Sequence, residues 1–343
     1  MDQLLRHHGD VDAVAGLLDF AVNVRGDRPP AWLRERLVAA LDRLGRYPCA
    51  AQDAAARVAV AARHGRDPAE VLVLAGVAEG FALLPALAPR SAAVVHPSFT
   101  EPEVSLRRAN ILVTRVPTDA AHRLRPERIP AEADLVVLGN PTNPTSVLHP
   151  AGTVRVLARP GRVLVVDEAF ADAEPAEAQS LATDRETPGL LVLRSLTKTW
   201  ALPGLRAGYA LGAPELLARL AAPRPPWPVG TLVLEAVRAC SAPAAVAEAA
   251  TAAAQIVRHR EWMAQRLADL PGVTVHLPAA APFLLLRVPS GERVRAALVD
   301  AGIAVRRADT FPGLTSDHLR VAVRPPEIAT LLVTALRVAL GGV

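Results

Sequence analysis

Lys198 is the only lysine among the 343 residues, and its chemistry is the hardest in this sequence to replace. The other 37 of the 38 lysine and arginine residues are arginines. Arginine serves as a permanent cation, but only lysine has an amine that can lose a proton, attack a carbonyl and form an imine. The alternative is a surface charge that survived a general drift toward arginine. The residues around Lys198 must decide between the two.

Chemically useful residues follow several short apolar runs of strand length. In an open α/β sheet, ligands bind beyond the carboxyl ends of the strands, so residues that follow such runs are expected to meet at one edge. Lys198 follows one of these runs and Asp167 ends another. The residues expected at this edge are Val77, Ala78, Phe99, Asn143, Asp167, Ser195, Lys198 and Arg206.

This set suits pyridoxal phosphate. The cofactor's aldehyde needs a lysine for an imine, and its ring nitrogen needs a carboxylate such as Asp167 to stay protonated. An aromatic ring such as Phe99 can stack on the cofactor, and the Asn143 amide can donate to the ring oxygen. Backbone N–H groups at Val77 and Ala78, with a hydroxyl and an arginine, can hold the phosphate; the last two are Ser195 and Arg206. Singly, each residue has an ordinary structural explanation, such as a cap, a turn or core packing.

The elements that must position these residues form an α/β pattern. Continuous apolar runs separated by helical segments predict a mostly parallel sheet covered by helices on both faces. The expected strands lie at 71–76, 92–97, 134–141, 162–169, 190–198 and 207–212. After residue 225 a long alanine-rich helical region and a strand-and-helix set predict a small α+β domain. The expected division is an N-terminal arm (1–30) associated with the small domain, a large domain (31–225) and the small domain (226–343).

Composition narrows the class of protein. The net charge of +4 comes from dispersed arginines without a long basic run, which favours anionic small molecules over nucleic acid as partners. The two cysteines suggest no disulfide framework, and no metal-ligand spacing is visible. The N-terminus lacks the apolar core of a signal peptide, and charges interrupt the most apolar helical stretch. A cytoplasmic enzyme that spans no membrane is therefore expected.

Three motifs now carry a resemblance to a known family. RSLTKTWALPGLRAGY (194–209), GNPTNPTS (139–146) and VVDEAF (165–170) resemble the signatures of fold-type I pyridoxal-phosphate enzymes of the class I/II aminotransferase family. The resemblance implies that Lys198 forms the Schiff base and Asp167 pairs with the pyridine nitrogen. It implies a homodimer, in which Tyr47 reaches the cofactor phosphate of the partner subunit. It also places Arg320, and Asn23 in LDFAVNV, at the substrate.

Two branches of that family stand out: histidinol-phosphate aminotransferases and the L-threonine-O-3-phosphate decarboxylases of cobalamin biosynthesis. Both act on phosphorylated amines or amino acids. RHHGD (6–10) resembles the substrate-contacting N-terminal arm of the decarboxylases through His7 and His8, although His8 replaces a glycine. Arg306 resembles their second anion-binding arginine. Phe170 stands where the transaminases have a tyrosine that bonds the ring oxygen. The decarboxylases resemble this sequence in having a phenylalanine there.

These features favour decarboxylation as the main expectation, with transamination as the alternative. If Arg320 holds the substrate carboxylate firmly in the plane of the cofactor ring, transamination is favoured instead. A pyridoxal-phosphate-binding regulatory protein without turnover is a third, weaker alternative, since no DNA-binding helical segment is visible. One departure from the family pattern is Ser146, where a glycine is usual after the asparagine-proline-threonine motif.

Overall fold

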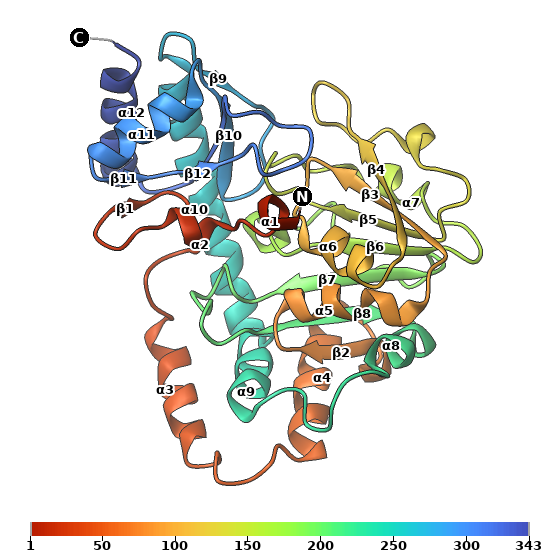
Figure 1. Cartoon of the computed structure of the whole chain (residues 1–343). Helices are drawn as coiled ribbons and strands as arrows, with labels where there is room; N and C mark the ends of the chain where they lie inside the picture. The colour runs from red at the N-terminus through yellow and green to blue at the C-terminus, as the bar shows by residue number, and fades with distance from the viewer. Residues whose placement is uncertain (1, 342–343) are drawn as a thin grey trace.

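A seven-stranded sheet forms the centre of the chain in the computed structural model, which describes residues 2–341 (Figure 1). Its strand order is β2-β8-β7-β6-β5-β3-β4, and only β8 runs antiparallel to its neighbours. This confirms the expected α/β fold with a mostly parallel sheet. The strands are β2 (Val71–Leu74), β3 (Ser91–His96), β4 (Leu112–Pro117), β5 (Leu135–Gly139), β6 (Val163–Asp167), β7 (Leu190–Ser195) and β8 (Gly208–Gly212).

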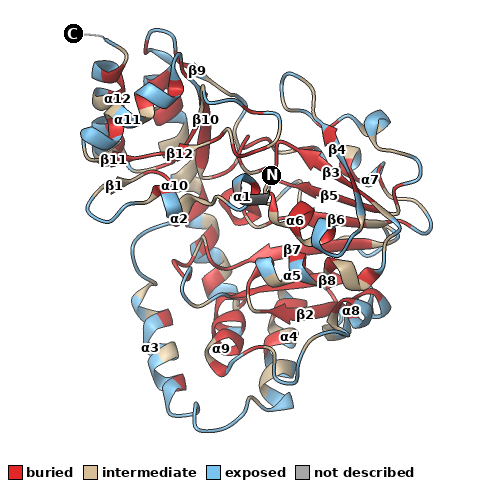
Figure 2. Cartoon of the chain, in the orientation of Figure 1, coloured by how far each residue is buried: buried red, intermediate tan, exposed pale blue. Residues whose placement is uncertain are grey.

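Helices cover this sheet because its central strands are apolar on both faces. β5 and β7 are buried at every residue, and separate hydrophobic clusters fill the two sides of the sheet. Figure 2 shows these strands almost wholly buried, whereas the outer surface of α3 is largely exposed. The helices of this part are α3 (Ala31–Leu41), α4 (Ala50–His64), α5 (Val77–Leu83), α6 (Glu101–Arg108), α7 (Ala151–Arg155), α8 (Pro214–Ala221) and α9 (Thr231–Cys240).

A second, four-stranded antiparallel sheet with the order β12-β13-β10-β9 has its own apolar cluster. Its elements, in chain order, are β9 (Thr274–Val275), β10 (Phe283–Arg287), α11 (Gly291–Asp300), β12 (Arg306–Arg307), β13 (His318–Ala322) and α12 (Pro326–Ala339). The long helix α10 (Pro243–Ala268) runs from the loop after β6 to this sheet. α9 and the start of α10 share the large sheet's cluster, so we propose a domain boundary within α10 in place of residue 226.

The N-terminal segment joins the two parts. Its strand β1 (Leu18–Asp19) pairs in parallel with β11 (Ile303–Ala304) of the small part. Before it, α1 (Asp2–Leu5) lies against α6, and α2 (Gly9–Asp12) lies against β12. In Figure 1 this segment crosses the space between the two sheets, and α1 lies beside α6. Among the helices of residues 2–341, none is long and apolar enough to cross a membrane.

Candidate active site

Asp167 ends β6 in the middle of the large sheet. It pairs with Gly139 of β5 on one side and with Leu193 of β7 on the other. Its carboxylate accepts one hydrogen bond, from the backbone N–H of Ala169 at 3.0 Å. Burial raises the pKa of Asp167 to about 7. A carboxyl group that is buried this deeply is suited to a cationic partner, such as a protonated ring nitrogen.

Lys198 lies in the turn after β7, close enough to Asp167 for each side chain to influence the pKa of the other. Burial, with the guanidinium groups of Arg320 and Arg206, lowers the pKa of Lys198 to about 8. The amine is therefore far easier to deprotonate than that of an ordinary lysine. The structure thus brings the predicted nucleophile and the predicted carboxylate together.

The predicted phosphate cradle also assembles. Arg206 lies against the N-terminus of α5. A Cβ added to Gly76, the residue before this helix, would stand 3.1 Å from the Nη2 atom of Arg206. Gly208 pairs with Ser195, and a Cβ on Gly208 would stand 3.2 Å from the backbone nitrogen of Val77. Gly76 lies at φ +82°, a backbone conformation that favours glycine, and a Cβ on Gly208 would also stand 2.7 Å from the backbone oxygen of Arg194. Val77 and its neighbour Ala78 therefore face the same space as Ser195 and Arg206.

Arg320, on β13 of the small sheet, reaches across to the large sheet. Its Nη1 donates to Asn143 Oδ1 at 2.6 Å, and its Nη2 donates to the backbone oxygen of Ala21 at 2.5 Å. In the amide orientation that satisfies its neighbours, the Asn23 side-chain oxygen accepts from Arg320 Nη1 at 3.1 Å. Burial and the nearby Arg306 lower the pKa of Arg320 to about 9. Three predicted site residues from distant segments therefore meet at one buried guanidinium.

Aromatic rings border the same region. The Phe99 ring, after β3, lies 5.8 Å from the Phe81 ring and 5.2 Å from the His8 ring, measured between centroids. Phe170 meets Phe283 edge to face at 4.9 Å, and Arg320 lies over the Phe283 ring at 5.3 Å. Phe170 is buried and has no hydroxyl, as its sequence position indicates.

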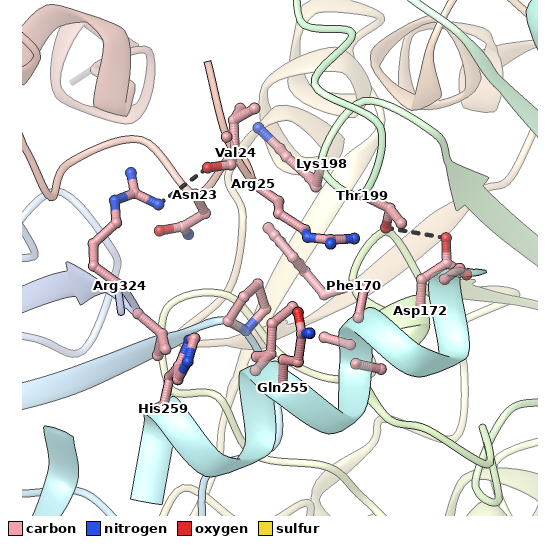
Figure 3. A pocket seen from close by; sticks show the side chains of 18 of the residues that line it. Asn23, Val24, Arg25, Phe170, Asp172, Lys198, Thr199, Gln255, His259 and Arg324 are labelled. Carbon is pink, nitrogen blue, oxygen red and sulfur yellow. Dashed lines mark hydrogen bonds between the residues drawn. The ribbon is translucent and has the colours of Figure 1, made fainter. Parts of the chain in front are cut away.

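A cavity of about 630 Å³ opens beside these residues (Figure 3). Lys198, Asn23 and Phe170 lie on its wall, but the remaining predicted cofactor residues do not. The cavity instead extends along α10, toward residues that the sequence did not single out. These are Arg25, Asp172, Thr199, Gln255, His259 and Arg324. The cavity therefore includes only the edge of the predicted site that is formed by Lys198, Asn23 and Phe170, and it continues from Lys198 toward α10.

The N-terminal arm places its two histidines differently. His8 lies over Phe99, and its Nε2 lies 2.7 Å from Glu101 Oε1. His7 Nε2 lies 3.1 Å from Asp12 Oδ2, away from Phe99. The guanidinium of Arg306 donates to Asp12 and to Thr310 Oγ1, at 3.1 and 2.7 Å, and to the backbone oxygen of His7 at 2.6 Å. Arg306 thus fastens the arm to the small sheet.

Tyr47 lies apart from the other predicted residues. It follows α3 and stacks on Trp227 with 4.2 Å between the ring centroids, and 74% of its surface is exposed. Tyr47 does not line the cavity beside Lys198.

The sequence analysis missed a buried ion cluster behind Lys198. Asp172, which accepts from two arginines of the cluster, lines the cavity, and the cation Arg194 is 1% exposed at the next-to-last position of β7. A signal for it was present, because an arginine inside an otherwise apolar strand needs a buried counter-ion. Within residues 2–341, no group of three or more His, Cys, Asp or Glu side chains is arranged to hold a metal ion.

The side chains fit pyridoxal phosphate. A buried carboxyl with a raised pKa, an amine with a lowered pKa and a hydroxyl–arginine pair at a helix start meet in the order that the cofactor requires. The residues that would hold it are Val77, Ala78, Phe99, Asn143, Asp167, Ser195, Lys198 and Arg206.

Comparisons with known proteins agree. The family described as aminotransferase class I and II matches residues 15–336. A histidinol-phosphate aminotransferase of Mycobacterium tuberculosis is 53% identical over 320 residues, 93% of this chain and 87% of that protein. A threonine-phosphate decarboxylase of Salmonella typhimurium is 32% identical over 348 residues, 95% of this chain and 92% of that protein. A histidinol-phosphate aminotransferase structure from Sinorhizobium meliloti, in complex with pyridoxal-5'-phosphate, superposes with a TM-score of 0.81 at 21% identity, covering 93% of this chain and 90% of that one.

Proposed function

The chain belongs to the aminotransferase class I and II family, whose members depend on pyridoxal phosphate, and from this we propose that it transaminates a phosphorylated amine of the histidinol-phosphate type. The sequence alone favoured decarboxylation. The relatives at 53% identity carry the name of the aminotransferase, whereas the threonine-phosphate decarboxylase is 32% identical, so similarity supports the alternative instead.

The set of contacts that holds the Arg320 guanidinium is the observation that carries this proposal. Its guanidinium is held by Asn143 and by the Ala21 carbonyl, and the Phe283 ring lies beneath it. A substrate carboxylate bound to a guanidinium held in this way would not turn freely out of the plane of the cofactor ring. In an amino donor such as glutamate, the bond to hydrogen is then the one left free to break.

Lys198 has the properties of the base for that step. Pyridoxal phosphate, when bound, supplies an aldehyde for covalent attachment of an amine and a ring that withdraws electrons from the adjacent carbon. Lys198 would hold the cofactor and, when released from it, remove the proton from that carbon. A pKa near 8 leaves a useful fraction of the free amine unprotonated at neutral pH. Asp167 would keep the ring nitrogen of the bound cofactor protonated.

We propose His8 as the arm's contact with the substrate. It is half-buried over Phe99 and held by Glu101, whose pKa it lowers through their hydrogen bond. Imidazole N–H groups can donate hydrogen bonds to a phosphate. His7 and Arg306, which the sequence also proposed for the substrate, fasten the arm to the small sheet through Asp12.

We further propose that the chain forms a homodimer. The surface around α3 exposes apolar side chains at Val38 (63%), Leu41 (48%) and Leu44 (52%), and the Tyr47–Trp227 stack continues it. Exposed apolar side chains at several positions of one segment are typical of a protein interface. A second copy of the chain on this surface would cover these side chains and carry Tyr47 toward the partner's site.

Threonine-phosphate decarboxylation remains the second candidate because Phe170 lacks the hydroxyl expected of a transaminase. One experiment separates the two reactions. The enzyme loaded with pyridoxal phosphate is given histidinol phosphate with 2-oxoglutarate, and glutamate is measured. In a second vessel it is given L-threonine O-3-phosphate without an oxo acid, and carbon dioxide is measured. We expect glutamate and no sustained release of carbon dioxide, and the reverse result would refute transamination.

A matched pair of variants tests the role of Arg320. Arg320→Gln should lower kcat/KM for glutamate about ten- to a hundredfold, since it removes a charged hydrogen-bonding partner. Arg307→Gln is the control, because Arg307 lies on the neighbouring strand but pairs only with Asp309 on the other side. Equal losses in the two variants would contradict the assignment of Arg320.

A further inference from the structure

A cluster of five buried or half-buried ionic side chains lies directly behind Lys198. Asp172 Oδ1 accepts from Arg63 Nη2 at 2.8 Å and also from Arg194 Nη2. Arg194 Nη1 donates to Glu168 at 3.1 Å and to Glu177 at 2.6 Å. Charged groups inside a protein are retained only where they are paired and hydrogen-bonded, and these are.

This cluster touches the chain next to both catalytic residues. Thr199, which follows Lys198, donates its hydroxyl to Asp172 Oδ2 at 3.2 Å, as the dashed line in Figure 3 shows. Glu168, which follows Asp167, is held by Arg194 and by the backbone N–H of Leu181, at 3.1 and 2.6 Å. Asp172 and Arg194 thus connect Thr199, the neighbour of Lys198, to Glu168, the neighbour of Asp167, through a continuous chain of polar contacts.

We propose that Asp172 is a positioning residue, which fixes the angle between Lys198 and Asp167 by holding Thr199 directly and Glu168 through Arg194. This inference rests on the proposed function only in requiring that pyridoxal phosphate binds between these two residues. The substrate does not enter it. The backbone alone would leave Lys198 in a turn, anchored on this side by one bond from the Arg25 N–H to its carbonyl at 3.0 Å.

The charge of Asp172 suits this role. Burial opposes its ionisation, but the guanidinium groups of Arg63 and Arg194 outweigh burial and hold its pKa well below its ordinary value. The carboxylate is therefore charged at neutral pH. A neutral amide could donate to one of its partners but would leave the two arginines with less negative charge.

The Asp172–Thr199 bond can be removed without touching the ion pairs. Thr199→Val deletes the hydroxyl at nearly constant volume, and Thr199→Ser retains it. Thr187→Val is the matched control, because Thr187 is also half-buried and donates its hydroxyl to a carboxylate, Asp184, at 2.9 Å. Asp184 takes part in neither the cavity nor the ion cluster described above.

Each variant, loaded with pyridoxal phosphate, is compared in the pH midpoint of its cofactor absorbance, the cofactor dissociation constant, kcat, KM and urea stability. For Thr199→Val we expect a midpoint shifted by about half a pH unit or more and a kcat about tenfold lower at similar KM, the equivalent of one hydrogen bond to a charged group. Thr199→Ser should restore both. Thr187→Val should lose stability but keep the wild-type midpoint and kcat.

A wild-type midpoint and kcat in Thr199→Val would overturn the proposal, and so would equal changes in Thr187→Val. The absorbance midpoint needs no substrate, so this test is separate from that of the proposed function. If the wild-type protein binds pyridoxal phosphate on Lys198 but transaminates nothing, the proposed function fails and the midpoints still decide the role of Asp172.

Discussion

Ser146 joins the loop that carries Asn143 to the small part of the molecule, and its replacement gives the most quantitative prediction. The residue is fully buried and lies at φ +63°, in the left-handed region. Its hydroxyl oxygen accepts from the buried N–H of Ala281 at 2.8 Å, and its carbonyl accepts from the N–H of Ala280 at 2.8 Å. A glycine would adopt this backbone more easily but would lack the hydroxyl.

The two effects can be separated by two substitutions. Ser146→Ala keeps the strained backbone and leaves the Ala281 N–H without its acceptor, which should cost about 1–3 kcal/mol of unfolding free energy. Ser146→Gly loses the same bond but relieves about 1–2 kcal/mol of left-handed strain. Its greater freedom in the unfolded chain offsets about 0.5–1 kcal/mol of that relief. We therefore expect the order wild type, Ser146→Gly, Ser146→Ala, with roughly 0.5–1 kcal/mol between the variants.

Urea unfolding followed by far-UV circular dichroism measures this order, with the cofactor removed so that its binding does not contribute to stability. Thr251→Ala serves as a control, since its exposed hydroxyl donates only to a carbonyl in its own helix. A Ser146→Ala variant as stable as the wild type would show that the bond to Ala281 contributes nothing. A Ser146→Gly variant less stable than Ser146→Ala would refute the argument from strain.

Three further predictions concern the amine and the surface. Lys198→Arg keeps the charge but removes the imine-forming amine, so borohydride should trap no cofactor adduct and turnover should fall at least about a hundredfold; an adduct seen by mass spectrometry would contradict this. In the cofactor-free protein, acylation of Lys198 should be half-maximal near pH 8, because the amine is protonated and unreactive below its pKa. Arg320→Gln should move that midpoint upward, and a wild-type midpoint near pH 10 would refute the effect of burial. Replacing Val38 and Leu41 together by glutamate should convert a dimer to a monomer in sedimentation velocity, with stability nearly unchanged because both side chains are exposed; an unaltered dimer would place the interface elsewhere.

The sheet and its catalytic edge could be predicted because the signal is local. Each apolar run is buried on both faces, and the residue at its end must lie at the carboxyl edge, as Asp167 and Lys198 do. The edge strand β4 was missed because only Val113 and Val116 of its six residues are buried, so it lacks a continuous apolar run. Helix α12 was not predicted either, although it buries leucines at a helical spacing against the small sheet.

Pairings between distant residues could not be predicted. Nothing near Arg306 in the sequence indicates that Asp12, 294 positions away, neutralises its guanidinium. The sequence proposed Arg306 for the substrate from its resemblance to the second anion-binding arginine of the decarboxylases. The ion cluster has the same character, since Arg63, Asp172 and Arg194 meet only when three separate segments fold together. The role proposed for Tyr47 requires a second chain, and it came from the family resemblance and not from any pattern of strands or helices.

The solitary lysine also has a spectroscopic consequence. Arginine side chains contain no primary amine, so the ε-nitrogen of Lys198 is chemically unique among the side chains. Isotopic labelling of lysine at that nitrogen would give one magnetic-resonance line for the whole 36.2 kDa protein, located at the reacting atom and needing no assignment. Protonation, covalent attachment and the approach of an anion to Arg320 would each displace that single line. The chain thus contains its own reporter of the events in its active site.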